Sequence, residues 1–459
     1  MKKQISLIGT FIGTVTAVSV LWALPTVVSL IPGQQFESGT VYAAEKKKKP
    51  RKVPPLTEKI YKAIAQAQLL IDPDSIPLEE GQERPDVIAD PRQAVSDLLE
   101  VLNRRKINSY EKAQVWNTLA FAYYTLEDTP NTMKAYENVL KQELISEALE
   151  LSSLRALFQL YYSQEQYQKS IDYMERWEAL RGKTDTQVTF IKATAYYQLE
   201  NFQKALESIL LVERLAIEEG KTIKENWWYF QVVIYNELKD VDNVINVLEK
   251  LIVAYPKKQY WMHLAGMYAE KEMEDKSLSA YYAAYSQGMF DKETEVVMLS
   301  QRLLNAEVPF EAARILEKGF DEGLIEKNEK NVRLLAMSYT MSQEMGRAID
   351  AWREATTYTD DGELHYRLAQ ALANEDRHKE ATASYREALD RGGLKEGQDS
   401  DANFWMGISL MQLKEWDDAT AAFRAAAKDK DRAKTARQYI AYIRGEKRRL
   451  KALKEMLEA

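Results

Sequence analysis

Apolar residues recur at three- and four-residue steps along most of the chain, and this spacing predicts amphipathic α-helices. Two helices are expected within residues 56–112, separated by a loop over residues 72–91 that is rich in Pro, Asp and Glu. From residue 113 onward the pattern also repeats over a longer distance, which corresponds to a pair of helices. Only three prolines follow residue 91, namely Pro130, Pro256 and Pro309. A stretch of this length with so few helix breakers is expected to be almost entirely helical.

Nine copies of one helix-pair pattern are predicted between residues 113 and 431. The first helix of each copy carries a large residue, then Leu or Met before Ala or Gly, then Tyr or Leu. The second helix opens on a small residue, at positions 132, 170, 205, 244, 277, 312, 348, 381 and 419. Small residues let the paired helices approach closely, whereas the aromatic residues fill the space toward the next pair. No pair can bury its apolar face alone, so neighbouring pairs are expected to stack.

This order of residues resembles the tetratricopeptide repeat family, whose unit is 34 residues long. The fifth copy shows it clearly, with Trp261, Leu264, Ala265 and Tyr268 in the expected order. The resemblance implies an all-α fold, a right-handed superhelical solenoid of antiparallel helix pairs. Repeats two to four fit least well at the first helix, where the second has Phe158 in place of a small residue.

Residues 432–459 are predicted to form a capping helix with a basic extension. Ala436, Tyr439, Ile440 and Ile443 make one apolar stripe that can seal the last repeat. The extension after them is rich in Arg and Lys. It is either a helix for a partner or a membrane surface, or a solvated face.

Residues 1–43 have the features of an export signal. Lys2 and Lys3 precede the uncharged run Ile5–Ile31, and Val41-Tyr42-Ala43 offers a cleavage site after Ala43. The alternative is an uncleaved inner-membrane anchor, because the run is long enough to span a bilayer. The basic residues that follow disfavour that orientation. In both cases the bulk of the chain is expected in the periplasm.

Residues 44–55 form a basic, Pro-containing linker. Like charges and prolines favour an extended backbone there. The linker can make a weak contact with an anionic surface through Lys46–Lys52, or it is a solvated spacer. Residues 1–44 carry a net charge of +1, and residues 45–62 and 428–459 carry +6 each, so residues 63–427 carry −21 within the total of −8. An acidic body argues against a nucleic-acid partner and suits basic or extended peptides.

The composition gives no support for catalysis. The chain has no cysteine and three isolated histidines. It lacks a phosphate-binding Gly-rich loop, a GxSxG motif and an HExxH motif. We therefore expect no enzyme, no catalytic residues, no cofactor and no metal site.

What remains is a binding surface. In the tetratricopeptide family the first helices line the concave face, and the resemblance places aromatic and amide groups there that suit an extended peptide or a helix. The alternative is that some of these aromatic residues only pack within the groove. The Lys and Asn of carboxylate-clamp repeats are replaced by Asn117 and Phe121, so capture of a C-terminal carboxylate is not expected. The candidate residues are Asn117, Phe121, Tyr124, Arg155, Gln159, Tyr162, Phe190, Tyr197, Tyr229 and Asn236.

The overall arrangement also resembles the tetratricopeptide proteins encoded beside TonB–ExbB–ExbD energy-transduction systems. The features that carry this resemblance are the export signal, the segment KKPRKVPPLTEKIYKAIAQAQLLID and the long repeat array. It implies a periplasmic accessory that contacts the TonB complex or a TonB-dependent receptor and so supports iron uptake. The alternative function is a binding module for envelope or cell-wall assembly.

Overall fold

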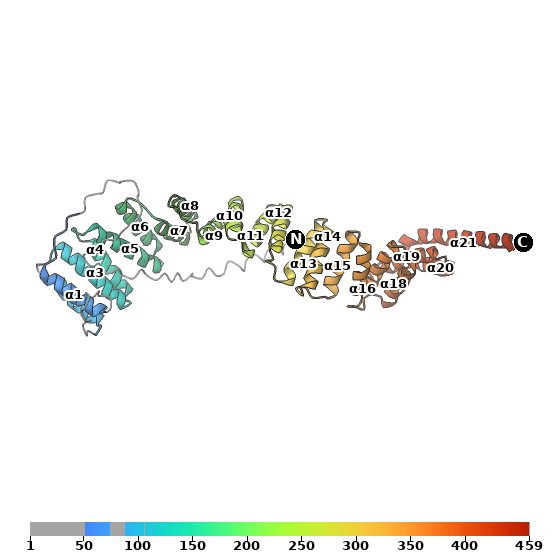
Figure 1. Ribbon diagram of the computed structural model, residues 1–459, viewed down its shortest axis with the longest axis horizontal. Coiled ribbons are helices and arrows are strands. Elements are labelled where there is room, and N and C mark those ends of the chain that lie inside the picture. Colours follow the sequence, from blue (N-terminus) through green and yellow to red (C-terminus); the bar gives the residue numbers. More distant parts are fainter. Residues whose placement is uncertain (1–50, 74–87, 105, 459) are drawn as a thin grey trace. The chain divides into compact units, whose positions relative to one another are not determined.

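The computed structural model describes residues 51–73, 88–104 and 106–458 (Figure 1). The predicted export signal, the run Lys46–Lys49 and most of the loop before the second helix lie outside the described residues. Every regular element in the described ranges is an α-helix. The all-α class predicted from the sequence is confirmed.

The helices fall into two compact units, one ending at Ile223 and the other beginning at Lys224. The helices of the first unit are α1 Glu58–Ile71, α2 Pro91–Leu102, α3 Ser109–Thr125, α4 Thr129–Leu140, α5 Glu147–Ser163, α6 Tyr167–Arg181, α7 Thr186–Gln198 and α8 Phe202–Glu218. Those of the second unit are α9 Glu225–Glu237, α10 Val241–Ala254, α11 Lys258–Glu270, α12 Glu274–Ser286, α13 Glu293–Asn305, α14 Pro309–Asp321, α15 Glu329–Met341, α16 Met345–Ala355, α17 Gly362–Asn374, α18 His378–Arg391, α19 Gln398–Gln412, α20 Trp416–Ala426 and α21 Lys430–Glu458.

Three-residue turns join the two helices of every predicted repeat, from α3–α4 to α19–α20. Connections this short make the paired helices antiparallel neighbours. Within each unit, successive pairs then pack against one another along the chain. The predicted solenoid of antiparallel helix pairs is confirmed by this packing.

The same backbone conformation recurs in all nine turns. The middle residue of each turn has a left-handed φ between 55° and 64°, although none of them is glycine. The N–H of the following residue then donates to a carbonyl of the last helical turn, as from Asp128 to Tyr123 over 2.9 Å. This is a Schellman ending, which satisfies the final carbonyls of the first helix. The nine residues are Glu127, Glu165, Glu200, Lys239, Glu272, Glu307, Gln343, Asp376 and Lys414.

The small residues that open the second helices lie at the centre of each pair. All nine are buried: Thr132, Ser170, Ala205, Val244, Ser277, Ala312, Ala348, Ala381 and Ala419. The second repeat accommodates Phe158 because its partner is a serine. The Ser170 hydroxyl donates to the Phe158 carbonyl over 2.7 Å, and the Phe158 ring meets Trp177 edge-on at 6.4 Å. A large residue on one helix is thus matched by a small one on the other.

The helix α21 closes the second unit. Ala436, Ile440 and Ile443 are buried in the last apolar cluster. The Tyr439 ring stacks on Phe423 of α20 at 5.1 Å and 7° between planes. These contacts cover the apolar surface of α20.

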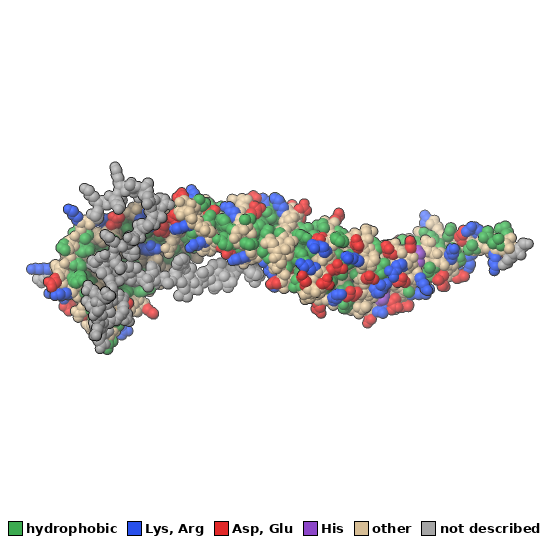
Figure 2. Space-filling model, in the orientation of Figure 1, with side chains coloured by type: hydrophobic (Ala, Val, Ile, Leu, Met, Phe, Trp, Pro, Cys, Tyr) green, Lys and Arg blue, Asp and Glu red, His purple; other side chains and the backbone are tan. Residues whose placement is uncertain are grey.

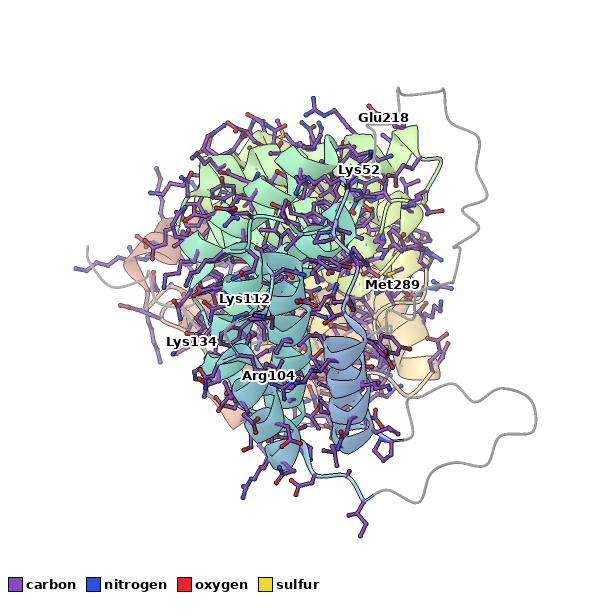
Figure 3. All side chains as sticks on the ribbon, turned by 90° about the vertical axis from the view of Figure 1, so that its left-hand side faces the viewer. Lys52, Arg104, Lys112, Lys134, Glu218 and Met289 are labelled. Carbon is purple, nitrogen blue, oxygen red and sulfur yellow. The ribbon has the colours of Figure 1, made fainter. Side chains whose placement is uncertain are left out.

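The extended residues before α1 lie against the N-terminal ends of two later helices. The Thr57 N–H donates to Glu111 of α3 over 2.9 Å, and the Arg51 guanidinium donates to Glu150 of α5 over 2.5 Å. Figure 3 shows the extended segment that carries Lys52 leading into α1. Glu111 is buried and also caps its own helix through the Asn108 N–H. This carboxylate therefore joins the start of the described chain to the first repeat.

Candidate protein-binding face

Eight of the ten candidate residues lie on the first helices of the first unit. We call this set the first-helix face: Asn117, Phe121 and Tyr124 of α3, Arg155, Gln159 and Tyr162 of α5, and Phe190 and Tyr197 of α7. Tyr124 is exposed, and the other seven are half-buried. Side chains in this state can contact a ligand while they are held in place by their own unit.

Two hydrogen bonds connect α5 to α7 across this face. The Arg155 guanidinium donates to the Gln187 side-chain carbonyl over 2.8 Å. The Tyr162 hydroxyl donates to the Thr194 hydroxyl over 3.1 Å. Both bonds span 32 residues, so they join corresponding surfaces of consecutive repeats. The first-helix face is therefore a continuous surface between repeats two and three.

The tyrosines at the C-terminal end of these helices differ in their packing. The Tyr162 ring meets Tyr167 of α6 edge-on at 5.4 Å, and the Tyr197 ring meets Phe202 of α8 at 5.4 Å. The residue that corresponds to Tyr167 in the first repeat is Thr129, which brings no ring. Tyr124 keeps 38% of its surface exposed. Packing within the repeat therefore accounts for part of the role of Tyr162 and Tyr197, whereas Tyr124 is the aromatic side chain most available for contact.

Tyr167 of α6, whose ring contacts Tyr162, borders this face. Burial raises the pKa of the Tyr167 hydroxyl, and the neighbouring Tyr162 and Glu165 raise it further. A phenol with a raised pKa stays protonated at neutral pH and can donate a hydrogen bond.

One donor on the face is left without an acceptor. The Nε–H of Arg155 is buried and has no hydrogen-bond partner among the described residues. Burying an unpaired donor is costly.

The remaining two candidates, Tyr229 and Asn236, lie on α9 in the second unit. Both are exposed. The Tyr229 ring lies 5.9 Å from that of Tyr260 on α11, and the Tyr260 hydroxyl donates to Glu225. Burial, and then that hydrogen bond, raise the pKa of Tyr260 to about 12. These residues lie on first helices of the second unit.

Sequence reasoning missed several residues at these surfaces. Gln187 and Thr194 complete the bridges from α5, and their repeat positions could have identified them. Met337 and Met341 of α15 are 42% and 48% exposed on the first helix of a later repeat, where Met337 corresponds to Thr194. Flexible methionines are common on adaptable binding surfaces. The first helix α15 therefore adds exposed thioether groups to the surface of the second unit.

A cavity of about 300 Å³ lies among α6, α7 and α8 of the first unit. Its polar groups include Lys192, whose ammonium lies 2.9 Å from Glu178 and 3.5 Å from Glu175. Burial alone lowers the pKa of Lys192, but the two carboxylates outweigh this and raise it. The positive charge of Lys192 is therefore already paired within the cavity. The lining residues are Glu178, Gly182, Lys183, Thr184, Thr189, Lys192, Ser208 and Leu211.

The described residues contain no group of three or more His, Asp or Glu side chains that could hold a metal ion. Burial lowers the pKa of His263 and His365, which favours neutral imidazoles at pH 7. Within the same part of the chain, no helix has both the length and the apolar character needed to cross a membrane.

Comparison with known proteins returns only distant similarity. No protein-family model and no curated protein matches the chain. Similar solved structures include MamA, with 18% identity, a TM-score of 0.32 and coverage of 38% of this chain and 97% of that one. YrrB, described as a TPR protein with an unusual peptide-binding site, has 17% identity, a TM-score of 0.33 and coverage of 42% and 97%. A tetratricopeptide repeat protein from Parabacteroides merdae has 15% identity, a TM-score of 0.31 and coverage of 57% and 99%. With TM-scores this low, the fold assignment rests on the helix pairs themselves.

Proposed function

We propose that the chain is a non-catalytic scaffold that binds a protein partner along the first-helix face. The observation that carries this proposal is the pair of bridges from Arg155 to Gln187 and from Tyr162 to Thr194. They merge the surfaces of consecutive first helices into one face that combines rings, amides and a guanidinium. Such a face suits an extended polypeptide, because aromatic groups supply apolar contact and polar groups pair with its backbone.

The bound segment is expected to be extended and uncharged or basic. The net charge of −21 over residues 63–427 favours association with basic partners and disfavours acidic ones. Binding is therefore expected to weaken as salt is added.

We further propose that this scaffold works in the periplasm as an accessory of a TonB-type energy-transduction system. The support is the export signal expected in residues 1–43 and the resemblance of the whole arrangement to proteins encoded beside such systems. The partner would be the TonB complex or a TonB-dependent receptor.

Site-specific photocrosslinking in cells tests the site and the partner together. A photoreactive phenylalanine analogue replaces Tyr124 on the face or Lys134 on the second helix α4, where Lys134 lies at the outer surface (Figure 3). We expect adducts from position 124 and not from position 134. Mass spectrometry then identifies the adduct. Equal crosslinking at both positions would rule out the first-helix face, and adducts that lack TonB-system components would rule out that partner.

The alternative function is a binding module for envelope or cell-wall assembly, favoured by the basic run in residues 45–52. It predicts that the chain sediments with isolated peptidoglycan and that neutralising Lys46–Lys52 abolishes sedimentation. The scaffold proposal predicts no such dependence.

A further inference from the structure

The C-terminal part of α21, residues 444–457, continues beyond the last repeat (Figure 1). We call it the distal segment. Ile443 before it is buried against α20, and Lys447 pairs with Asp417 of α20 over 2.6 Å. After Lys447 the apolar side chains become progressively more exposed, from 40% at Leu450 and 47% at Leu453 to 81% at Leu457. The apolar stripe of α21 that covers the final repeat thus continues along the helix beyond that repeat.

Two stripes run side by side along the distal segment. Leu450, Leu453 and Leu457 recur at steps of three and four residues, which places them on one face of the helix. The lysines Lys447, Lys451 and Lys454 recur at the same steps one quarter-turn away. Arg444 and Arg448 lie further round, on the side away from the leucines. The segment contains six basic residues and two acidic ones.

We propose that the distal segment binds the surface of an anionic lipid bilayer. The helix would lie in the plane of the interface, with its leucines and Met456 entering the acyl boundary. Lysines that border an apolar stripe can extend their ammonium groups to lipid phosphates. The exposed Tyr442, which begins the uncovered stripe, suits the headgroup level. This inference stands independently of the proposed function.

Charge disfavours a second copy of the chain as the occupant. In a coiled coil built on the leucine stripe, Leu450 and Leu453 would take core positions, and so would Glu446. The positions flanking such a core would be filled by Lys447, Arg449 and Lys454. These basic residues would face one another in both parallel and antiparallel pairs, and like charges there oppose association. At an anionic surface the same basic residues are attracted to lipid phosphates and do not face one another.

A bilayer also fits better than an acidic protein helix. A protein groove requires side chains in a fixed register and anchors in a pocket. The distal segment instead offers flexible Leu and Met side chains, whose exposure increases toward the C-terminus. A lipid surface needs no register, only separation of apolar and basic faces.

The absence of cysteine in the chain allows a local test in the full-length protein. A single thiol is introduced by Leu453→Cys on the apolar face or Arg448→Cys on the basic face and labelled with an environment-sensitive fluorophore. Vesicles of phosphatidylcholine, with or without phosphatidylglycerol, are then added. A local label reports on α21 even if the apolar run Ile5–Ile31 also attaches the chain to vesicles.

We expect a blue shift at position 453 with phosphatidylglycerol vesicles, and little change at position 448 or with neutral vesicles. Adding Lys451→Gln and Lys454→Gln to the Leu453→Cys variant should raise the lipid needed for half-maximal shift by about 30-fold. Circular dichroism verifies that the exposed substitutions preserve the helices. No shift with anionic vesicles, or equal shifts with both vesicle types, would overturn the proposal. A shift that grows with protein concentration without lipid would overturn it in favour of self-association.

Discussion

Gly407 of α19 lies directly against the ring of Phe423 of α20. A β-carbon at position 407 would lie 2.9 Å from the Phe423 Cε1 atom. The ring cannot easily move away, because it stacks on Tyr439 at 5.1 Å and meets Phe404 at 5.6 Å. The close approach of this helix pair therefore depends on the missing side chain.

Gly407→Ala and Gly266→Ala are expected to change stability in different directions. A β-carbon at position 266 of α11 meets no atom within 4 Å, so the variant should gain about 1 kcal/mol from helix propensity. Gly407→Ala has the same gain but also overpacks Phe423, at a cost of about 1–3 kcal/mol. Chemical denaturation of both variants measures the difference. Equal stabilisation by both would contradict the close approach seen at Gly407.

The left-handed turn residues predict a second stability change. Glu272 has φ 59°, a conformation that costs a residue with a side chain about 1 kcal/mol relative to glycine. Glu272→Gly should therefore stabilise the fifth repeat by about 0.5 kcal/mol after the added entropy of the unfolded chain is counted. The control Glu270→Gly, in the helical part of α11, should destabilise it by about 1 kcal/mol. The idea fails if thermal denaturation ranks the two variants the other way round.

The buried carboxylate of Glu363 predicts a pH-dependent stability. Glu363 is 5% exposed, and it accepts from Arg333 over 2.6 Å and from Lys395 over 3.2 Å. Burial alone raises its pKa, but these cationic donors outweigh burial and lower the pKa below the ordinary value of 4.5. A lowered folded-state pKa stabilises the protein above about pH 4.5, and this stabilisation is lost as the pH falls through the folded-state pKa.

Glu363→Gln should therefore lower the free energy of unfolding at pH 7 by about 2 kcal/mol. The difference from the parent protein should shrink at acidic pH, where the parent carboxyl is protonated. Urea denaturation at a series of pH values measures this difference. The exposed Glu396 of the neighbouring loop supplies the control, since Glu396→Gln should alter stability by less than about 0.5 kcal/mol at every pH. A pH-independent loss in Glu363→Gln would show that packing, not charge, is responsible.

The two parts of α21 are expected to differ in their importance for folding. Ile443 is fully buried, so Ile443→Ala should destabilise the last repeat by about 2–4 kcal/mol. Removal of residues 448–459 leaves the cap intact, and protection in α19 and α20 should be unchanged. Hydrogen exchange followed by mass spectrometry reads these helices separately. Faster exchange in the truncated chain would mean that the distal segment helps to hold the repeat together.

The fold could be predicted because the repeat pattern reports on helix packing. Ala348, Ala381 and Ala419 recur at the positions where the two helices of a pair approach most closely. The limit on side-chain volume at these positions is set within each pair, so it is visible in the local sequence. The prolines support the same reading, since Pro130 and Pro309 occupy the first turns of α4 and α14. A missing amide hydrogen does no harm at those positions.

Other features left no local signal in the sequence. The left-handed turns contain Glu, Lys, Gln and Asp, and none has the glycine that usually marks such an ending. Glu111 and Glu363 are buried, but nothing in their neighbours along the chain separates them from many exposed glutamates. Their burial depends on partners about 30 to 50 residues away, at Thr57 and Arg333.

At the candidate binding face too, the sequence identified some of the residues and not others. Family resemblance supplied Arg155 and Tyr162, but not the bridging residues Gln187 and Thr194. A hydrogen bond between repeats depends on how far one repeat rotates against the next, and a one-dimensional pattern does not give that rotation. The positions of Arg155 and Tyr162 on first helices follow from the repeat pattern, but the hydrogen bonds that join them to the next repeat do not.

The nine left-handed turns also bear on how an array of this kind can change in length. Each turn keeps its shape through hydrogen bonds of the backbone, as in the bond from Glu415 to Leu410, and it tolerates acidic, basic and amide side chains alike. A duplicated or deleted repeat would therefore need no special residue at the new junction within its pair. Gene duplication could alter the number of repeats while selection acts only on the surfaces that meet neighbours and partners.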